Sequence, residues 1–118
     1  MNRSHVISFC YLLAAVQTVI AAEKPMVVSR TVMVPMRDGV LLATDVYQSP
    51  DVKQAPVVLM RTPYNKARAK NVAERFAAAG LIAVVQDCRG KFESEGIFYP
   101  YDNEGQDGFD TIEWLGQQ

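Results

Sequence analysis

The residues best placed to do chemistry lie in the second half of the chain, in the segments RTPYNK (61–66) and DCRGKFESEG (87–96). Each segment follows a short apolar run, and ligands of open α/β sheets gather where strands end. Tyr64 could donate its phenolic O–H to the negative oxygen that develops during acyl transfer. On position alone, a loop aromatic that covers the core is the simpler interpretation of Tyr64, so other features must decide its role.

Two further side chains resemble nucleophiles but are not expected to act as such. Ser94 lies in FESEG, which has no glycine two residues before the serine, whereas a nucleophile elbow needs small residues on both sides. Cys88 follows an apolar run and is expected to be a small buried residue. The one histidine, His5, lies in the N-terminal apolar segment, so the rest of the chain has no imidazole base. No spacing typical of a metal or cofactor site is found.

The charged residues near these segments are expected to be structural. Four of them should pair with one another in one loop rather than act as a general base: Asp87, Arg89, Glu93 and Glu95. Lys66 and Arg68, next to Tyr64, would suit an anionic acyl group, but a solvated loop end is the simpler interpretation.

The first 22 residues have the pattern of a secretory signal peptide. Arg3 supplies the positive charge, residues 6–16 the apolar stretch, and Ala21 and Ala22 the small residues at a cleavage site. The apolar run is shorter than the roughly 18 residues that span a bilayer, so we expect cleavage near Ala21 or Ala22 and a secreted or periplasmic product with no membrane anchor. Cys10 would leave with this segment.

The composition is that of an ordinary globular domain, with 49% hydrophobic and 21% charged residues and a formal net charge of −1. No basic patch that would bind nucleic acid is visible. Neither a linker nor a repeat divides residues 23–118, which are expected to form one domain or part of one.

Hydrophobic patterns predict the order hairpin, strand, helix, strand, long loop, helix. The hairpin strands are expected at 27–34 and 40–47, the later strands at 57–60 and 81–85, and the helices at 71–79 and 107–115. Strand, helix, strand is the unit that builds parallel sheets, so the sequence predicts an α/β fold with a mostly parallel sheet. In the last helix, Phe109, Ile112, Trp114 and Leu115 are expected to be buried, and Asp107, Asp110 and Glu113 to be solvated or capping.

Four motifs in this order carry a family resemblance: MRDGVLLATDVY, RTPYNK, DCRGKFESEG and NEGQDGFDTIEWL. Together they resemble the N-terminal part of the X-Pro dipeptidyl-peptidase-like α/β-hydrolases, a family that includes cocaine esterase. The resemblance covers about residues 34–118. It implies an α/β-hydrolase core whose first half is present here, and acyl transfer by a Ser-Asp-His triad.

Within these residues, the resemblance assigns one catalytic position. Tyr64 matches the family tyrosine that donates to the oxyanion hole, whereas the nucleophilic serine, the aspartate and the histidine are not in this sequence. We therefore expect the N-terminal part of a secreted serine hydrolase acting on a small ester, amide or peptide. The alternative is a non-catalytic binding or regulatory remnant of the same fold. Substrate identity and oligomeric state are left open.

Overall fold

The computed structural model describes residues 22–118, so the predicted signal peptide lies almost wholly outside the described residues. The described chain forms one mixed sheet and two α-helices, as expected for an α/β fold. The elements in chain order are β1 (Val28–Pro35), β2 (Leu41–Gln48), β3 (Val57–Thr62), the 3₁₀-helix η1 (Lys66–Ala69), α1 (Lys70–Ala78), β4 (Ile82–Asp87) and α2 (Glu104–Gly116). No helix in this part of the chain is long and apolar enough to cross a membrane.

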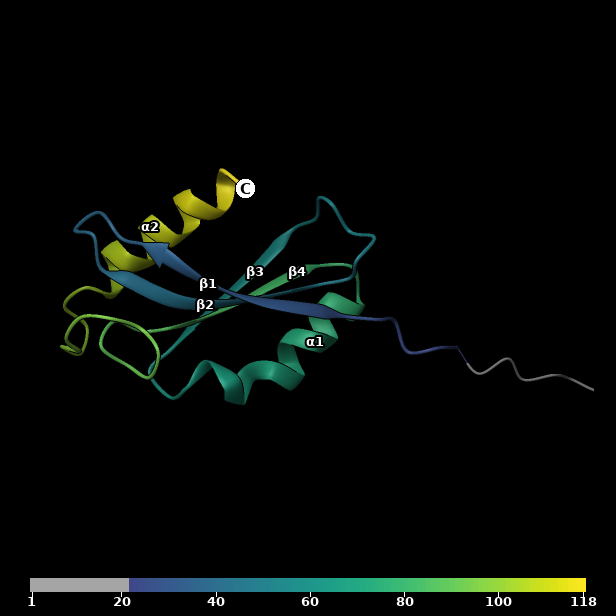
Figure 1. Ribbon diagram of the computed structural model, residues 1–118, viewed down its shortest axis with the longest axis horizontal. Helices are drawn as coiled ribbons and strands as arrows, with labels where there is room; N and C mark the ends of the chain where they lie inside the picture. The colour runs from purple at the N-terminus through teal and green to yellow at the C-terminus, as the bar shows by residue number, and fades with distance from the viewer. Residues whose placement is uncertain (1–21) are drawn as a thin grey trace, which may run out of the picture.

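The strands lie in the order β1-β2-β4-β3 (Figure 1). β3 and β4 are parallel and are connected through α1, as the strand, helix, strand pattern predicted. β1 and β2 form the expected antiparallel hairpin, and β2 also pairs antiparallel with β4. The apolar runs of β3 and β4 therefore lie side by side, and β4 lies between β3 and the hairpin strand β2.

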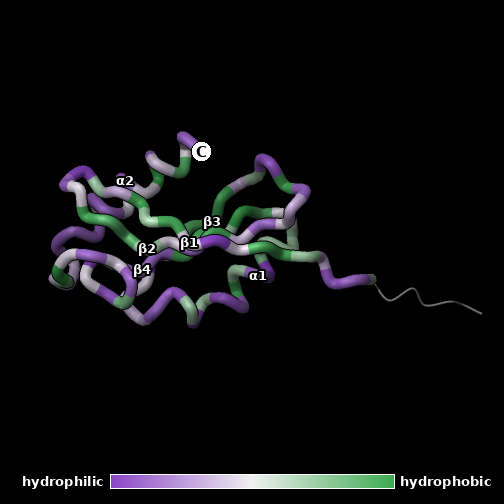
Figure 2. The backbone as a smooth tube through the Cα atoms, in the orientation of Figure 1, coloured by the Kyte–Doolittle hydropathy of each residue, from purple (hydrophilic) through white to green (hydrophobic). Residues whose placement is uncertain are grey.

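The two α-helices lie on opposite sides of the sheet (Figure 1). Against α1, the core contains Tyr47, Ala83 and Val85 from the strands and Ala73 and Ala77 from the helix. On the α2 side, Trp114 packs on a second cluster made of Val34, Met36 and Leu42. In Figure 2 the hydrophobic colour runs along parts of the strands, whereas many of the connecting segments are hydrophilic. The sheet therefore has an apolar core on each face, and β2 contributes to both of them through Tyr47 and Leu42.

The first helix begins earlier than expected because a single 3₁₀ turn, η1, precedes it. Its end agrees with the prediction, since Gly80 adopts a φ of +89° directly after the last turn. The Gly80 amide donates to the carbonyl of Ala77 over 3.0 Å, which satisfies a free carbonyl at the helix end. A side chain at this φ would be strained, so glycine sets the reversal into β4.

The second helix does not bury the face that its apolar stripe suggested. Phe109 and Ile112 are 57% and 59% exposed, while Asp107 and Thr111 are almost fully buried. The prediction was wrong because polar partners on the sheet side decide the orientation: Asp107 pairs with Arg89, and Thr111 donates to Gln86 over 3.1 Å. Trp114 is partly buried, as expected, whereas the solvated role predicted for Asp107 is incorrect.

Arg89 ties the long loop after β4 to the rest of the fold. Its guanidinium donates to both carboxylate oxygens of Asp107, and the shorter of these two distances is 2.7 Å. It also donates to Asp38 in the hairpin turn, where the shorter distance is again 2.7 Å. The next residue, Gly90, lies so close to Ile97 and Phe98 that a Cβ there would come within 2.3 Å of the Phe98 amide nitrogen. Only glycine allows this loop to fold back on itself.

We predict that Arg89→Ala lowers the free energy of unfolding by about 3 kcal/mol, because it leaves the buried carboxylate of Asp107 with no cation nearer than Arg61, whose Nη2 lies 3.8 Å away. Arg37→Ala is the matched control, since Arg37 forms a similar bidentate pair with Asp110 on the same helix but is exposed. A far smaller loss is expected there. Urea titration of the complete encoded protein measures both, and equal losses would contradict the prediction.

β3 lies at the sheet edge in the described part of the chain, and its first residue, Val57, is 43% exposed. We therefore predict that the 118-residue chain, produced by itself, associates through this edge. Val57→Lys should reduce the association, because charge on an edge strand opposes strand pairing. Val72→Lys on α1, where the valine is equally exposed, should not. Analytical ultracentrifugation distinguishes these outcomes; a monomeric wild-type chain that melts cooperatively would refute the prediction.

Candidate active site

The two segments singled out from the sequence lie together at one edge of the sheet. β3 and β4 run parallel with Thr62 paired to Asp87, so both strands end at the same level. The amide of Cys88 continues the ladder by donating to the carbonyl of Thr62 over 3.0 Å. Pro63 and Tyr64 therefore leave the sheet beside Cys88, as expected for groups at the carboxyl ends of parallel strands.

Tyr64 is 73% exposed and lies against a cleft of about 390 Å³. The cleft is lined by residues from the ends of β3 and β4, the long loop and the start of α2: Arg61, Pro63, Tyr64, Cys88, Phe98, Pro100, Tyr101 and Glu104. Three of these side chains are aromatic. A phenol at the mouth of a partly apolar cleft is suited to donate a hydrogen bond to a bound molecule.

The loop that carries Tyr64 is held by short local hydrogen bonds. The amide of Tyr64 donates to the Thr62 hydroxyl over 3.0 Å. Asn65 adopts a φ of +81° and ψ of 114°, and its side-chain oxygen accepts from the Ala67 amide over 2.9 Å. A positive φ is uncommon for a residue other than glycine and is maintained only where the surroundings enforce it. The loop is therefore constrained directly beside Tyr64.

The carboxylate of Asp87 meets this loop from the neighbouring strand. Asp87 is fully buried; one oxygen accepts from the Lys66 amide over 2.7 Å and the other from the Glu93 amide over 3.5 Å. Burial raises the pKa of Asp87, while these two amide bonds act in the opposite direction. Asp87 thus acts as an acceptor for backbone N–H groups, in line with the structural role predicted for it.

The predicted mutual pairing of Asp87, Arg89, Glu93 and Glu95 is wrong, because no ion pair joins any two of these side chains. Arg89 pairs with Asp38 and Asp107 instead of Glu93 or Glu95. Lys66 is buried, which overturns the solvated position expected for it. Its ammonium group binds the carboxylate of Glu93 and lies 3.4 Å from that of Asp45, which is what makes the burial possible. These four acidic partners come from segments too far from Arg89 or Lys66 in sequence for local patterns to connect them.

A second charged pair forms one wall of the cleft. Arg61 donates from Nη1 to the Glu104 carboxylate over 2.6 Å, and from Nε to Gln86 over 2.8 Å. The Cys88 thiol lies 3.4 Å from the same Glu104 oxygen. Burial, followed by the negative charge of Glu104, raises the pKa of Cys88 to about 11. The thiol therefore stays protonated near neutral pH and is a poor nucleophile, as expected.

The described residues offer a donor near the cleft but no complete catalytic set. Ser94 is buried, donates to the Asp87 carbonyl over 2.7 Å and accepts from the Ala43 amide over 2.9 Å, so its hydroxyl is not free to attack. Residues 22–118 contain no histidine. Over the same residues, no group of three or more His, Cys, Asp or Glu side chains is arranged to hold a metal ion.

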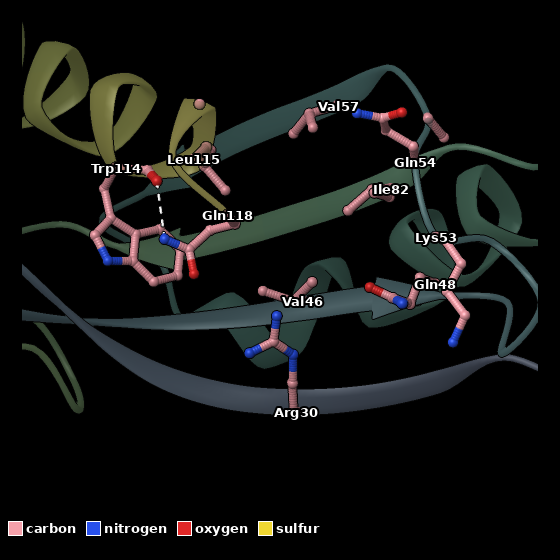
Figure 3. A pocket seen from close by; sticks show the side chains of 12 residues that line it. Arg30, Val46, Gln48, Lys53, Gln54, Val57, Ile82, Trp114, Leu115 and Gln118 are labelled. Atoms are coloured by element: carbon pink, nitrogen blue, oxygen red, sulfur yellow. Dashed lines mark hydrogen bonds between the residues drawn. The ribbon is translucent and has the colours of Figure 1, made fainter.

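Another cavity, of about 330 Å³, lies between the end of α2 and the sheet (Figure 3). Trp114 and Leu115 face it from the helix, and Arg30 from β1. Its lining contains no carboxylate, cysteine or serine. The cleft beside Tyr64 is therefore the better candidate for an active site.

Sequence reasoning missed several residues of that cleft. Phe98, Pro100 and Tyr101 lie in the irregular stretch after β4, where neither helical nor strand periodicity applies. Tyr101 has a φ of +70° and is 92% exposed, which is unusual for a large aromatic residue. The aromatic content of the FYPY segment was the available signal.

Comparison with known proteins gives a consistent result. The model of the X-Pro dipeptidyl-peptidase (S15) family matches residues 38–118. Cocaine esterase of Rhodococcus sp. (strain MB1 Bresler) is 42% identical over an alignment of 98 residues, and the match covers 77% of this chain and 17% of that protein. Among solved structures, an α-amino acid ester hydrolase is similar with a TM-score of 0.70 and 31% identity, over 92% of this chain and 22% of that one.

An aminopeptidase from the marine sediment archaeon Thaumarchaeota archaeon is also similar, with a TM-score of 0.68 and 28% identity over 99% of this chain and 22% of the other. The chain thus spans only about a fifth of the length of these relatives. The family match nevertheless includes both strand ends and the whole cleft beside Tyr64. The chain belongs to the X-Pro dipeptidyl-peptidase (S15) family of hydrolases.

Proposed function

We propose that these residues are the N-terminal part of a secreted or periplasmic serine hydrolase that cleaves a small ester, amide or peptide by acyl transfer. The observation that carries the proposal is the exposed phenol of Tyr64, at a parallel strand end beside an aromatic cleft. The hydrolases to which the chain is similar include an esterase, an ester hydrolase and an aminopeptidase, which supports a carbonyl substrate without selecting one.

In this proposal, a serine of the longer protein attacks the substrate carbonyl and a histidine takes the proton. As the new C–O bond forms, the carbonyl oxygen becomes an oxyanion, and the Tyr64 O–H donates a hydrogen bond to it. Collapse of this intermediate expels the leaving group, which takes the proton from the histidine. Water, deprotonated by the same histidine, then hydrolyses the acyl-enzyme, and the proton returns to the serine. Tyr64 contributes because its hydrogen bond is stronger to the oxyanion than to the neutral carbonyl.

The first test is to determine the reading frame beyond codon 118. The proposal expects the frame to continue into a G-x-S-x-G-like motif, followed later by an aspartate and a histidine. A stop at that position would refute the hydrolase proposal for this chain and favour a binding or regulatory remnant of the fold.

In the complete encoded protein, Tyr64→Phe should lower kcat by about 10²- to 10³-fold, the usual cost of removing one oxyanion donor, with little change in KM. Tyr99→Phe is the matched control, because Tyr99 is also exposed but does not line the cleft. Steady-state hydrolysis of p-nitrophenyl acetate and of an amino acid p-nitroanilide gives both constants. A Tyr64→Phe protein as active as the Tyr99→Phe control would rule out the oxyanion role.

A further inference from the structure

We propose that Asp87 is a positioning residue for Tyr64. By accepting a hydrogen bond from the Lys66 amide, it fixes the loop that carries the Tyr64 side chain. The inference rests on the proposed function of Tyr64 and adds to it the residue that sets the phenol's place. It does not require Asp87 to touch the substrate.

The amide groups of the loop differ in where their acceptors lie. Local acceptors satisfy the amides of Tyr64, Ala67 and Arg68, since Thr62 and Asn65 lie within three residues of them. The Lys66 amide differs, because its acceptor is the carboxylate of Asp87 on β4. This bond, at 2.7 Å, joins the backbone of the loop to the sheet two residues after Tyr64.

Asp87 is itself held firmly in the fold. Asp87 is fully buried in the last position of β4, and its own carbonyl accepts from the Ser94 hydroxyl over 2.7 Å. The carboxylate is held again by the Glu93 amide. Asp87 is therefore a rigid anchor, and hydrogen bonds from backbone amides to a carboxylate are among the strong ones in proteins.

The residue between Tyr64 and Lys66, Asn65, has a strained backbone conformation. Asn65 has a φ of +81° and links Tyr64 to Lys66. Such a conformation persists only when its surroundings determine it. Without the bond between Asp87 and Lys66, only the contacts of Asn65 with the amides of Ala67 and Arg68 oppose its return to a negative φ, which would rotate the preceding peptide and displace the Tyr64 ring. A displacement of about 1 Å at a catalytic group can cost about a hundredfold in rate.

The ion pairs of the Lys66 side chain also connect the loop to its surroundings, but they do not replace the hydrogen bond from the Lys66 amide to Asp87. The ammonium group binds Glu93 and approaches Asp45 at the end of a long flexible chain. These contacts fix where Nζ lies, whereas the amide contact fixes the backbone from which Asn65 and Tyr64 extend.

A double-mutant cycle in the complete encoded protein tests the inference. Asp87→Ala should lower kcat by roughly 10- to 100-fold with little change in KM. In the Tyr64→Phe background, the same change should lower kcat by less than about twofold, because the donor that Asp87 positions is already gone. Hydrogen exchange of the Lys66 amide should also become faster in Asp87→Ala.

Asp107→Asn is the matched control, since it alters an equally buried carboxylate on α2 that does not bind the Tyr64 loop. Its effect should be the same factor with or without the Tyr64 hydroxyl, as expected for a general loss of stability. If Asp87→Ala does not fold, Asp87→Asn repeats the cycle with a side chain of the same shape. It should give a smaller loss with the same dependence on Tyr64.

The outcomes separate the two proposals. If Tyr64→Phe lowers kcat but the Asp87 variants lower it equally in both backgrounds, only the positioning role is overturned. Unchanged exchange at the Lys66 amide in Asp87→Ala also overturns it. If Tyr64→Phe leaves kcat unchanged, the oxyanion role fails and the positioning role fails with it.

Discussion

The guanidinium of Arg89 is the constraint on which the arrangement of the described residues depends. It brings together the hairpin turn at Asp38, the loop after β4 and the helix α2 at Asp107. A carboxylate as buried as that of Asp107 is stable only with a charged, hydrogen-bonded partner. The orientation of α2 follows from this pairing, and with it the position of Glu104 at the wall of the cleft.

Once α2 is oriented in this way, a chain of polar contacts crosses its side of the sheet. Gln86 accepts from Arg61 and from Thr111, and donates to Thr44 on β2. The bonds join three strands to the helix, and each of the four side chains has at least one partner. Most of the polar groups in this interface satisfy one another; the exception is Arg61 Nη2, which is buried without a hydrogen-bond partner and lies 3.8 Å from the Asp107 carboxylate. Trp114 supplies apolar packing from α2.

Local patterns predicted the parts of this fold that local chemistry decides. Two short runs apolar on both faces became the parallel strands, and a glycine after an alanine-rich helix became its C-terminal cap. The face of α2 could not be predicted in this way, since Asp107 becomes a core residue only through a partner 18 positions earlier. The burial of Lys66 likewise depends on Asp45 and Glu93, which are distant in sequence. In the candidate site, the sequence predicted Tyr64 and its location at a strand end, but not the aromatic wall formed by the irregular loop.

The two arginine–aspartate pairs on α2 also differ in their access to dissolved ions. Asp107 faces inward to Arg89, whereas Asp110, one turn later, pairs with Arg37, whose side chain is 53% exposed. Salt screens charges in contact with water far more than buried ones. Rising ionic strength should therefore weaken the attachment of α2 to the hairpin turn at Arg37 while its inner attachment at Arg89 remains. In saline surroundings the helix would then be held chiefly along its inner side, and its outer edge would gain freedom to move.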